Sequence, residues 1–189
     1  LFHHDRIGDH LRLNLDDPKL LDLRNESGLS RISLLWCWTC EIPRGSFEYR
    51  LLDQGARVDV IGWTRGRKHR DRPYRAYPSE FPAAWATLED IPSTVAEDVR
   101  RLNRREIKLS AVHREQWAKP RHQVGGEPFF SGGMPERPRC SACGQDPELL
   151  AAVADECTDP RGFAGNEFVQ TLFWICSRCA VVLAQQDSD

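Results

Sequence analysis

Two runs near the C-terminus carry the strongest hydrophobic pattern in the chain. Residues 168–175 and 180–183 are apolar at nearly every position, and each run has the length of a β-strand. Apolar side chains on both faces are typical of strands in the middle of a sheet, where each face is covered. The short segment between the runs leaves room for a turn, so the pattern predicts a hairpin of two buried strands.

The N-terminal half alternates apolar and polar residues, as half-buried strands do. A strand is predicted over 32–40, followed by a hairpin of strands over 47–51 and 58–63 with its turn at Asp53-Gln54-Gly55. Because these three strands follow one another closely, we expect them to pair in sequence order as an antiparallel meander. Alternating leucines also predict a short edge strand over 11–15.

One helix is predicted, over residues 94–107. Thr94 and Glu97 have the spacing of a capping box. Apolar residues then recur every three to four positions from Val95 to Leu102, which places them on one helical face.

Two pairs of cysteines enclose the C-terminal region. Cys140 and Cys143 form one CxxC pair, and Cys176 and Cys179 form another at the turn of the predicted hairpin. Two residues between the cysteines let both sulfurs of a pair face one ion, and four thiolates are a ligand set typical of structural zinc. Buried free cysteines explain one such pair more easily than two. The spacing therefore predicts a zinc-ribbon-like site with Zn²⁺ as a structural cofactor.

Residues 147–154 give conflicting signals. Asp146 and Pro147 suit the start of a helix, and the alanines and leucines that follow are good helix formers. A zinc ribbon would instead place a strand after its first cysteine pair. We favour the strand.

These elements predict an α+β fold, mainly antiparallel sheet with one clear helix and a C-terminal zinc-ribbon-like module. The length of 189 residues suits a single domain over 1–189. Within it we expect a sheet-rich body over 30–130 and the zinc-ribbon-like module over 136–187, packed on that body.

A third CxxC pair, Cys37 and Cys40, raises the question of thiol chemistry. A redox pair needs its first cysteine at a helix N-terminus, where the helix dipole lowers the thiol pKa. The residues that follow include Pro43 and Gly45 and predict no helix. In a regular strand the two cysteines would also point to opposite faces. Buried structural cysteines are the favoured interpretation; redox and metal roles are weaker, and Cys157 is expected to be a loop thiol.

Charge is unevenly distributed along the chain. The formal net charge is −2, yet basic residues outnumber acidic ones 14 to 8 between Arg65 and Arg121. The stretch 65–77 combines arginines, which could grip phosphates, with tyrosines, which could stack on bases. A pI near 6.3 favours a protein partner, because nucleic-acid binders are usually basic throughout. The predicted partner-binding residues are Arg65, Arg67, Lys68, Arg70, Arg72, Tyr74 and Arg75.

The sequence also predicts a cytoplasmic protein with no membrane partner. No apolar run approaches the ~20 residues that span a bilayer, and the first residues lack the order of a signal peptide. Six of the seven cysteines lie in CxxC pairs, which argues for metal or thiol chemistry in a reducing compartment.

Several stretches of the chain share a family likeness. They are residues 36–40, 47–51 and 122–128, together with the pairs at 140–143 and 176–179. They resemble bacterial proteins of the YwqG-like family, which is largely uncharacterised. The resemblance implies a mixed, sheet-dominated fold and no particular activity. Family members commonly follow the double glycine of 122–128 with an aromatic residue and a glutamine; this chain has Phe129-Phe130-Ser131, so a role for that glutamine does not carry over.

A site closed by four cysteines leaves no position for water, which makes it structural rather than catalytic. We therefore predict a non-catalytic, zinc-containing protein-interaction module. One concrete form is an immunity-type inhibitor of a partner protein, a hypothesis that rests on analogy. A nucleic-acid-binding protein that uses residues 65–77 is the alternative, and a thiol redox enzyme that uses residues 37–40 is the weaker one.

Overall fold

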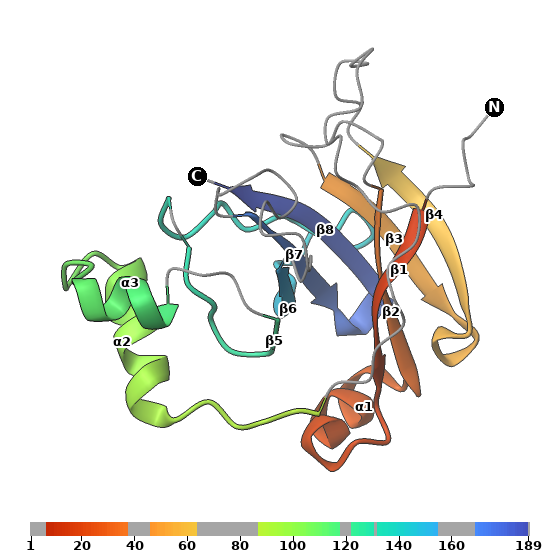
Figure 1. Ribbon diagram of the computed structural model, residues 1–189. Coiled ribbons are helices and arrows are strands. Elements are labelled where there is room, and N and C mark those ends of the chain that lie inside the picture. Colours follow the sequence, from red (N-terminus) through yellow and green to blue (C-terminus); the bar gives the residue numbers. More distant parts are fainter. Residues whose placement is uncertain are drawn as a thin grey trace.

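A computed structural model describes residues 7–37, 46–63, 87–117, 122–130, 132–154 and 169–188. Its strands are β1 (Ile7–Asn14), β2 (Arg31–Cys37), β3 (Ser46–Leu52), β4 (Arg57–Trp63), β5 (Gln123–Val124), β6 (Glu148–Ala154), β7 (Val169–Cys176) and β8 (Val181–Ser188). Its α-helices are α1 (Leu21–Ser27), α2 (Ser93–Asn103) and α3 (Ala111–Trp117). The fold is α+β with mainly antiparallel sheet, as the hydrophobic pattern predicts (Figure 1).

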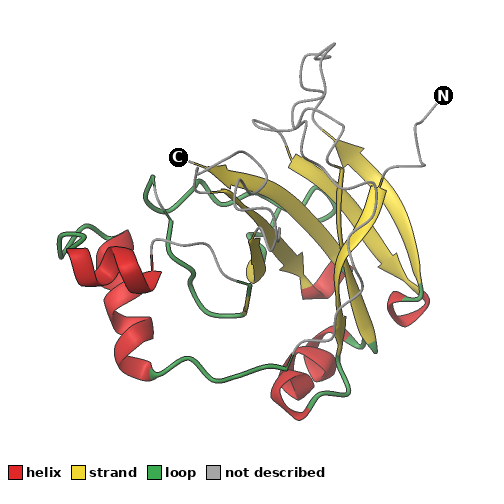
Figure 2. Cartoon of the chain, in the orientation of Figure 1, coloured by secondary structure: helices red, strands yellow, loops and turns green. Residues whose placement is uncertain are grey.

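Six strands form the central sheet in the order β4-β3-β8-β7-β6-β5, with every pair antiparallel. Figure 2 shows most of the strands, in yellow, gathered in one part of the molecule. The predicted hairpin of buried strands is confirmed: β7 and β8 lie in the middle, and residues 170–176 are buried on both faces. The pairing of β3 with β8 joins the N-terminal and C-terminal halves of the chain. The predicted body and the predicted module therefore share one sheet.

The two faces of the sheet are covered differently. On one face Phe47, Tyr49 and Phe173 pack against the two-stranded sheet of β1 and β2. The buried hydroxyl of Tyr49 donates to the carbonyl of Ser33 at 2.8 Å and accepts from the N–H of Leu35 at 3.0 Å. These contacts hold β2 across the sheet face. The other face carries the cysteines and a second apolar cluster.

The predicted three-stranded meander is wrong at its first strand. β3 and β4 form the expected hairpin, but β2 pairs with β1, in a separate sheet that includes the predicted edge strand at 11–15. β2 packs its apolar side chains onto the main sheet instead of extending it. The predicted strand over 32–40 is described only as far as Cys37.

The hairpin turn between β3 and β4 lies where the sequence predicts it. Asp53, Gln54 and Gly55 all adopt positive φ angles, of 50°, 56° and 89°. Gly55 is required there: a Cβ atom at this position would lie 1.9 Å from the carbonyl oxygen of Arg31.

The helices differ more from the prediction than the strands do. α2 ends at Asn103 instead of 107, and no side chain caps its N-terminus, so the capping box is wrong. The helix ends because Arg105 turns to φ 59°, which breaks the helical path. α1 and α3 were not predicted, and both are only seven residues long. Among the described residues, no helix is long and apolar enough to cross a membrane.

The conflict over residues 147–154 resolves as β6, a strand. Its backbone pairs with β7 over Glu148–Ala154 and with the short β5 on its other side. Leu150, Ala151 and Val153 are buried in the core. Pairing on two sides outweighs the local helix preference of these alanines and leucines.

Candidate metal centre

The turn between β7 and β8 forms one half of the site, which we call the second knuckle (Cys176–Ala180). Cys176 ends β7, and Cys179 lies in the short 3-10 turn that leads to β8. The turn closes because Ala180 adopts the left-handed conformation, with φ 52° and ψ 37°, and donates its N–H to Ser177 at 3.3 Å. The carbonyl of Ala180 accepts from the N–H of Leu51 at 2.8 Å, which fixes the knuckle to β3.

The other half is the first knuckle (Cys140–Gly144), which lies in the irregular segment 132–147. The N–H of Gly144 donates to the carbonyl of Cys140 at 2.7 Å. The N–H of Cys140 in turn donates to the carbonyl of Gln145 at 3.0 Å. Gly144 has a φ of 71°, a conformation that glycine adopts without strain. The chain therefore reverses tightly enough to bring both cysteines of the pair to one side.

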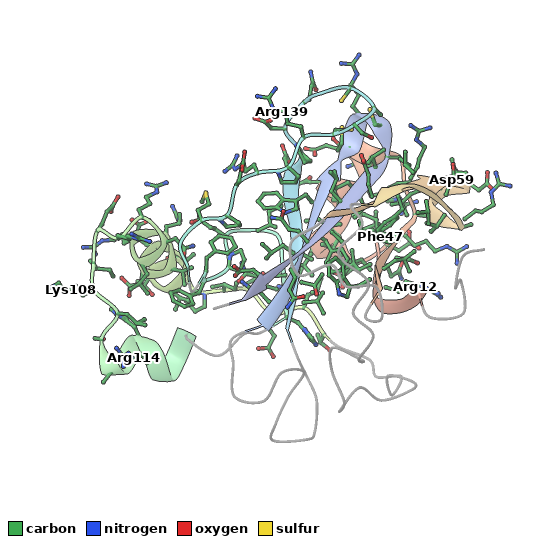
Figure 3. The ribbon with its side chains drawn as sticks, turned by 90° about the horizontal axis from the view of Figure 1, so that it is seen from above. Arg12, Phe47, Asp59, Lys108, Arg114 and Arg139 are labelled. Carbon is green, nitrogen blue, oxygen red and sulfur yellow. The ribbon has the colours of Figure 1, made fainter. Side chains whose placement is uncertain are left out.

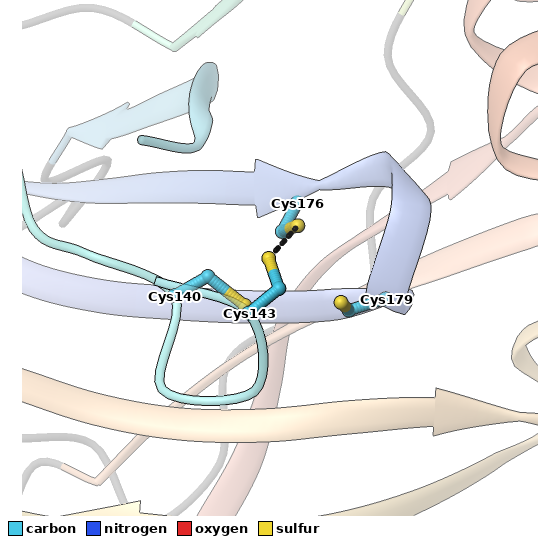
Figure 4. Close-up of side chains that lie close together, drawn as sticks. All are labelled: Cys140, Cys143, Cys176 and Cys179. Carbon is cyan, nitrogen blue, oxygen red and sulfur yellow. Dashed lines mark hydrogen bonds between the residues drawn. The ribbon is translucent and has the colours of Figure 1, made fainter. Parts of the chain in front are cut away.

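The two knuckles bring four sulfurs together (Figure 4). The Sγ atoms of Cys140, Cys143, Cys176 and Cys179 all lie within 4.8 Å of one another. The Sγ atoms of Cys143 and Cys176 are 3.7 Å apart. In a tetrahedral site with Zn–S bonds of about 2.3 Å, neighbouring sulfurs are about 3.8 Å apart. The four thiols are free of disulfides and could bind a metal ion.

The surroundings of the cluster keep its inner side dry. Cys140 and Cys176 are 1% and 6% exposed, whereas Cys143 and Cys179 are half-buried at the surface. The apolar residues that pack with the cysteines come from β6, β7, β8 and the preceding loop. They are Phe130, Leu149, Ala152, Leu172, Trp174, Val181 and Leu183. A metal here would be reached from one side only, and its inner ligands are held by packed neighbours.

The surroundings shift the pKa values of the thiols in different directions. The backbone N–H of Gln145 is the main reason that the pKa of Cys143 is lowered to about 7. Burial raises the pKa of Cys176 to about 12. The hydrogen bond with the Cys143 thiol is the main cause of the raised pKa of Cys179, and burial adds to it. Without a metal, Cys143 thus loses its proton more readily than Cys176 or Cys179; a bound cation would stabilise the ligands as thiolates.

A carboxylate that the sequence analysis missed holds the first knuckle in place. Glu48, on β3, is only 9% exposed. Its Oε1 accepts hydrogen bonds from the backbone N–H of Ser141 at 3.1 Å and from the Ser141 hydroxyl at 2.8 Å. Ser141 lies between the two cysteines of the pair. Glu48 and Ser141 are 93 positions apart in the chain, so no local pattern could reveal this contact.

Most of the remaining candidate residues are not described by the structure. The predicted partner-binding residues over 65–75 and the cysteines Cys40 and Cys157 lie outside the described residues. Cys37 is the last residue of β2, which belongs to the two-stranded sheet on the opposite face.

Comparison with known proteins adds no relative. No family model matches the chain, and searches of curated proteins and of solved structures found no match. The resemblance to the YwqG-like family therefore stays a prediction from the sequence.

Proposed function

We propose that the four cysteines bind one Zn²⁺ ion, whose role is structural. The observation that carries the proposal is the convergence of four sulfurs, from two knuckles, within 4.8 Å of one another. Tetrahedral sites of four sulfurs hold zinc or iron–sulfur groups. The 3.7 Å separation of Cys143 and Cys176 fits the edge of a tetrahedron around a single ion.

A zinc ion at this position would join two parts of the chain that no strand pairing connects. Cys140 and Cys143 belong to the irregular segment 132–147, and Cys176 and Cys179 belong to the central hairpin. Four protein ligands leave zinc no position for water or substrate, so the ion supplies cross-linking and no chemistry.

Zinc content of the purified protein tests this proposal. We expect one zinc and no iron per chain by elemental analysis. A Cys143→Ser/Cys179→Ser variant changes the two half-buried ligands and should lose the zinc and unfold at a lower temperature than the wild type. Cys157→Ser, which removes a cysteine outside the proposed ligand set, is the matched control and should keep the ion. A zinc-free wild type that unfolds cooperatively would contradict the proposal, and iron in place of zinc would reassign the metal.

We further propose that the protein acts by binding another protein, through the basic stretch 65–77. The support is its sequence: five arginines and a lysine beside two tyrosines, in a chain whose formal net charge is −2. A centre closed by four sulfurs favours a binding role over catalysis. An immunity-type inhibitor that blocks an acidic partner is the concrete form of this hypothesis.

Charge reversal tests the interaction. The Arg67→Glu/Arg70→Glu/Arg72→Glu variant should lose a partner that the wild-type protein captures in stoichiometric amounts from its own cells. An Arg101→Glu/Arg104→Glu/Arg114→Glu variant makes the same charge change on the helices and should retain that partner. Equal capture by both variants would remove the 65–77 stretch from the account. Binding to a 20-nucleotide DNA that falls steeply with salt would instead favour the nucleic-acid alternative.

A further inference from the structure

A pocket of about 300 Å³ lies between the C-terminal end of α2 and the loop that leads to the first knuckle. Its inner wall is apolar, and two cationic residues complete the lining. The lining residues are Leu102, Arg105, Ile107, Lys108, Leu109, Phe129, Phe130 and Gly133. Leu102 and Phe130 are buried, whereas Arg105 and Lys108 are exposed. The volume is at the small end of the range for sites that bind small molecules.

Hydrogen bonds hold the opposite walls of the pocket together. Asn103, the last residue of α2, is 6% exposed and lies beside the lining residue Leu102. Its Nδ2 donates to Glu127 Oε1 at 2.9 Å and to the carbonyl of Pro128 at 2.8 Å. Its Oδ1 accepts from the N–H of Phe130 at 3.0 Å. The pocket is therefore pre-formed, because a single buried side chain ties the helix end to the loop.

Arg105 occupies a backbone position that normally takes glycine. It has a φ of 59°, and the N–H of the next residue, Glu106, donates to the carbonyl of Arg101 at 2.9 Å. This is the C-terminal Schellman arrangement, in which a side chain costs conformational energy. The guanidinium extends to the loop across the pocket, where Nη2 donates to the carbonyl of Gly132 at 3.4 Å. An arginine at this strained position points to a function of the side chain.

The two cations of the lining have no carboxylate partner in the part of the chain that the structure describes. Within the described ranges, no carboxylate forms an ion pair with Arg105 or Lys108. Lys108 lies at the helical end of the molecule, far from Asp59 on β4 (Figure 3). Two unpaired cations next to an apolar cavity suit a ligand that has an anionic head and an apolar body.

We propose that this pocket binds a small amphiphilic carboxylate. Its carboxylate pairs with Arg105 and Lys108, and its aliphatic or aromatic body packs against Leu102, Phe129 and Phe130. The planar fork of the arginine suits a carboxylate, because it can donate two parallel hydrogen bonds. This site contains none of the four cysteines, although its lining residue Phe130 also packs in the apolar cluster around them.

Titration with octanoate, followed by calorimetry on the purified full chain, tests the site. Octanoate should bind, whereas octanol, which lacks the charge, and octylamine, which reverses it, should bind at least about tenfold more weakly. Failure of octanoate to bind would overturn the proposal. Equal binding of octanol would also overturn it, because the cations would then play no part.

Two substitutions locate the binding. Arg105→Gly removes the guanidinium and also relieves the left-handed backbone, so it should raise the Tm by roughly 2–4 °C. The same variant should bind octanoate about tenfold or more weakly. Arg104→Gln changes the adjacent arginine, which does not line the pocket, and should leave octanoate binding unchanged. Unaltered octanoate affinity in Arg105→Gly would overturn the proposal, and the Tm measurement shows independently that the variant folds.

Discussion

The two knuckles of the cysteine centre have the same backbone plan but different support. In each, two residues separate the cysteines, and the residue after the second cysteine adopts a left-handed conformation: Gly144 at φ 71° and Ala180 at φ 52°. The second knuckle ends a ladder of eight residue pairs between β7 and β8. The first knuckle lies in the irregular segment 132–147, between the two-residue strand β5 and the strand β6.

This difference shows which knuckle is held in its conformation by the sheet and which one depends more on a bound metal. The second knuckle is fixed by strand pairing and by the hydrogen bond from Leu51. The first knuckle is fixed by its own turn and by the hydrogen bonds of Ser141 to Glu48. A metal bound by both knuckles therefore stabilises the conformation of the first knuckle more than that of the second.

Of the changes considered, removal of the metal should cause the largest loss of stability. Binding of structural zinc by small domains is worth about 10–16 kcal/mol. After chelation we expect the backbone amides of segment 132–147 to lose protection in hydrogen exchange by mass spectrometry. The amides of β7 and β8 should remain protected, because strand pairing holds them. Equal loss of protection in both knuckles would contradict the greater dependence of the first knuckle on the metal.

The second-largest expected effect is the difference in reactivity between the Cys143 and Cys176 thiols of the metal-free protein. The pKa of Cys143 is lowered to about 7 and that of Cys176 is raised to about 12. At pH 8 Cys143 is mostly thiolate and Cys176 mostly thiol, so iodoacetamide should modify Cys143 at least roughly 50-fold faster. Peptide mass spectrometry measures both rates. Because bound metal requires thiolates, metal affinity should rise with pH, and the dependence should be steeper below about pH 7, where Cys143 is protonated as well as Cys176. Similar rates for the two cysteines would contradict the assigned environments.

Glu48→Ala tests the support of the first knuckle. The substitution removes two hydrogen bonds to a charged acceptor and should lower the free energy of unfolding by about 2–3 kcal/mol. Ser141→Ala removes only the hydroxyl and keeps the backbone N–H, so about 1 kcal/mol is expected. Denaturant unfolding of the metal-bound protein measures both. Equal losses of stability in Ser141→Ala and Glu48→Ala would show that the hydrogen bond from the backbone N–H of Ser141 to Glu48 does not stabilise the protein.

The smallest expected effects come from substitutions of the two left-handed residues, Gly144 and Ala180, and they should be opposite in sign. Gly144→Ala adds a Cβ that meets no atom within 4 Å, so its cost is conformational and should be about 1 kcal/mol. Ala180→Gly relieves the same conformation in the second knuckle and should stabilise the protein by up to about 1 kcal/mol. Thermal unfolding of the two variants should shift in opposite directions. A shift in the same direction would show that the knuckles do not share a backbone plan.

The parts that could be predicted from the sequence were those with a local or strongly periodic signal. The continuous apolar runs predicted β7 and β8, and the CxxC spacing identified the four cysteines that the fold brings together. Local preference alone would have made a helix of 147–154; pairing with β7 makes it a strand. Alternation in β2 predicted a strand but not its partner, because a strand packed across a sheet has the same pattern as one within it.

Long-range contacts and strained residues could not be predicted. Glu48 supports the first knuckle across 93 positions, and its carboxylate gave no signal in an otherwise ordinary strand. Arg105 ends α2 where a glycine would have marked the stop, so the predicted helix continued to 107. Both residues depart from the local rules, and both belong to parts of the molecule to which we assign a role.

X-ray absorption at the zinc edge tests whether the four cysteines bind zinc. It reports both the identity of the metal and the atoms bound to it in the purified protein. We expect a single shell of four sulfur atoms at about 2.3 Å from zinc. Absence of zinc, or a shell that contains nitrogen or oxygen ligands, would contradict a closed centre of Cys140, Cys143, Cys176 and Cys179.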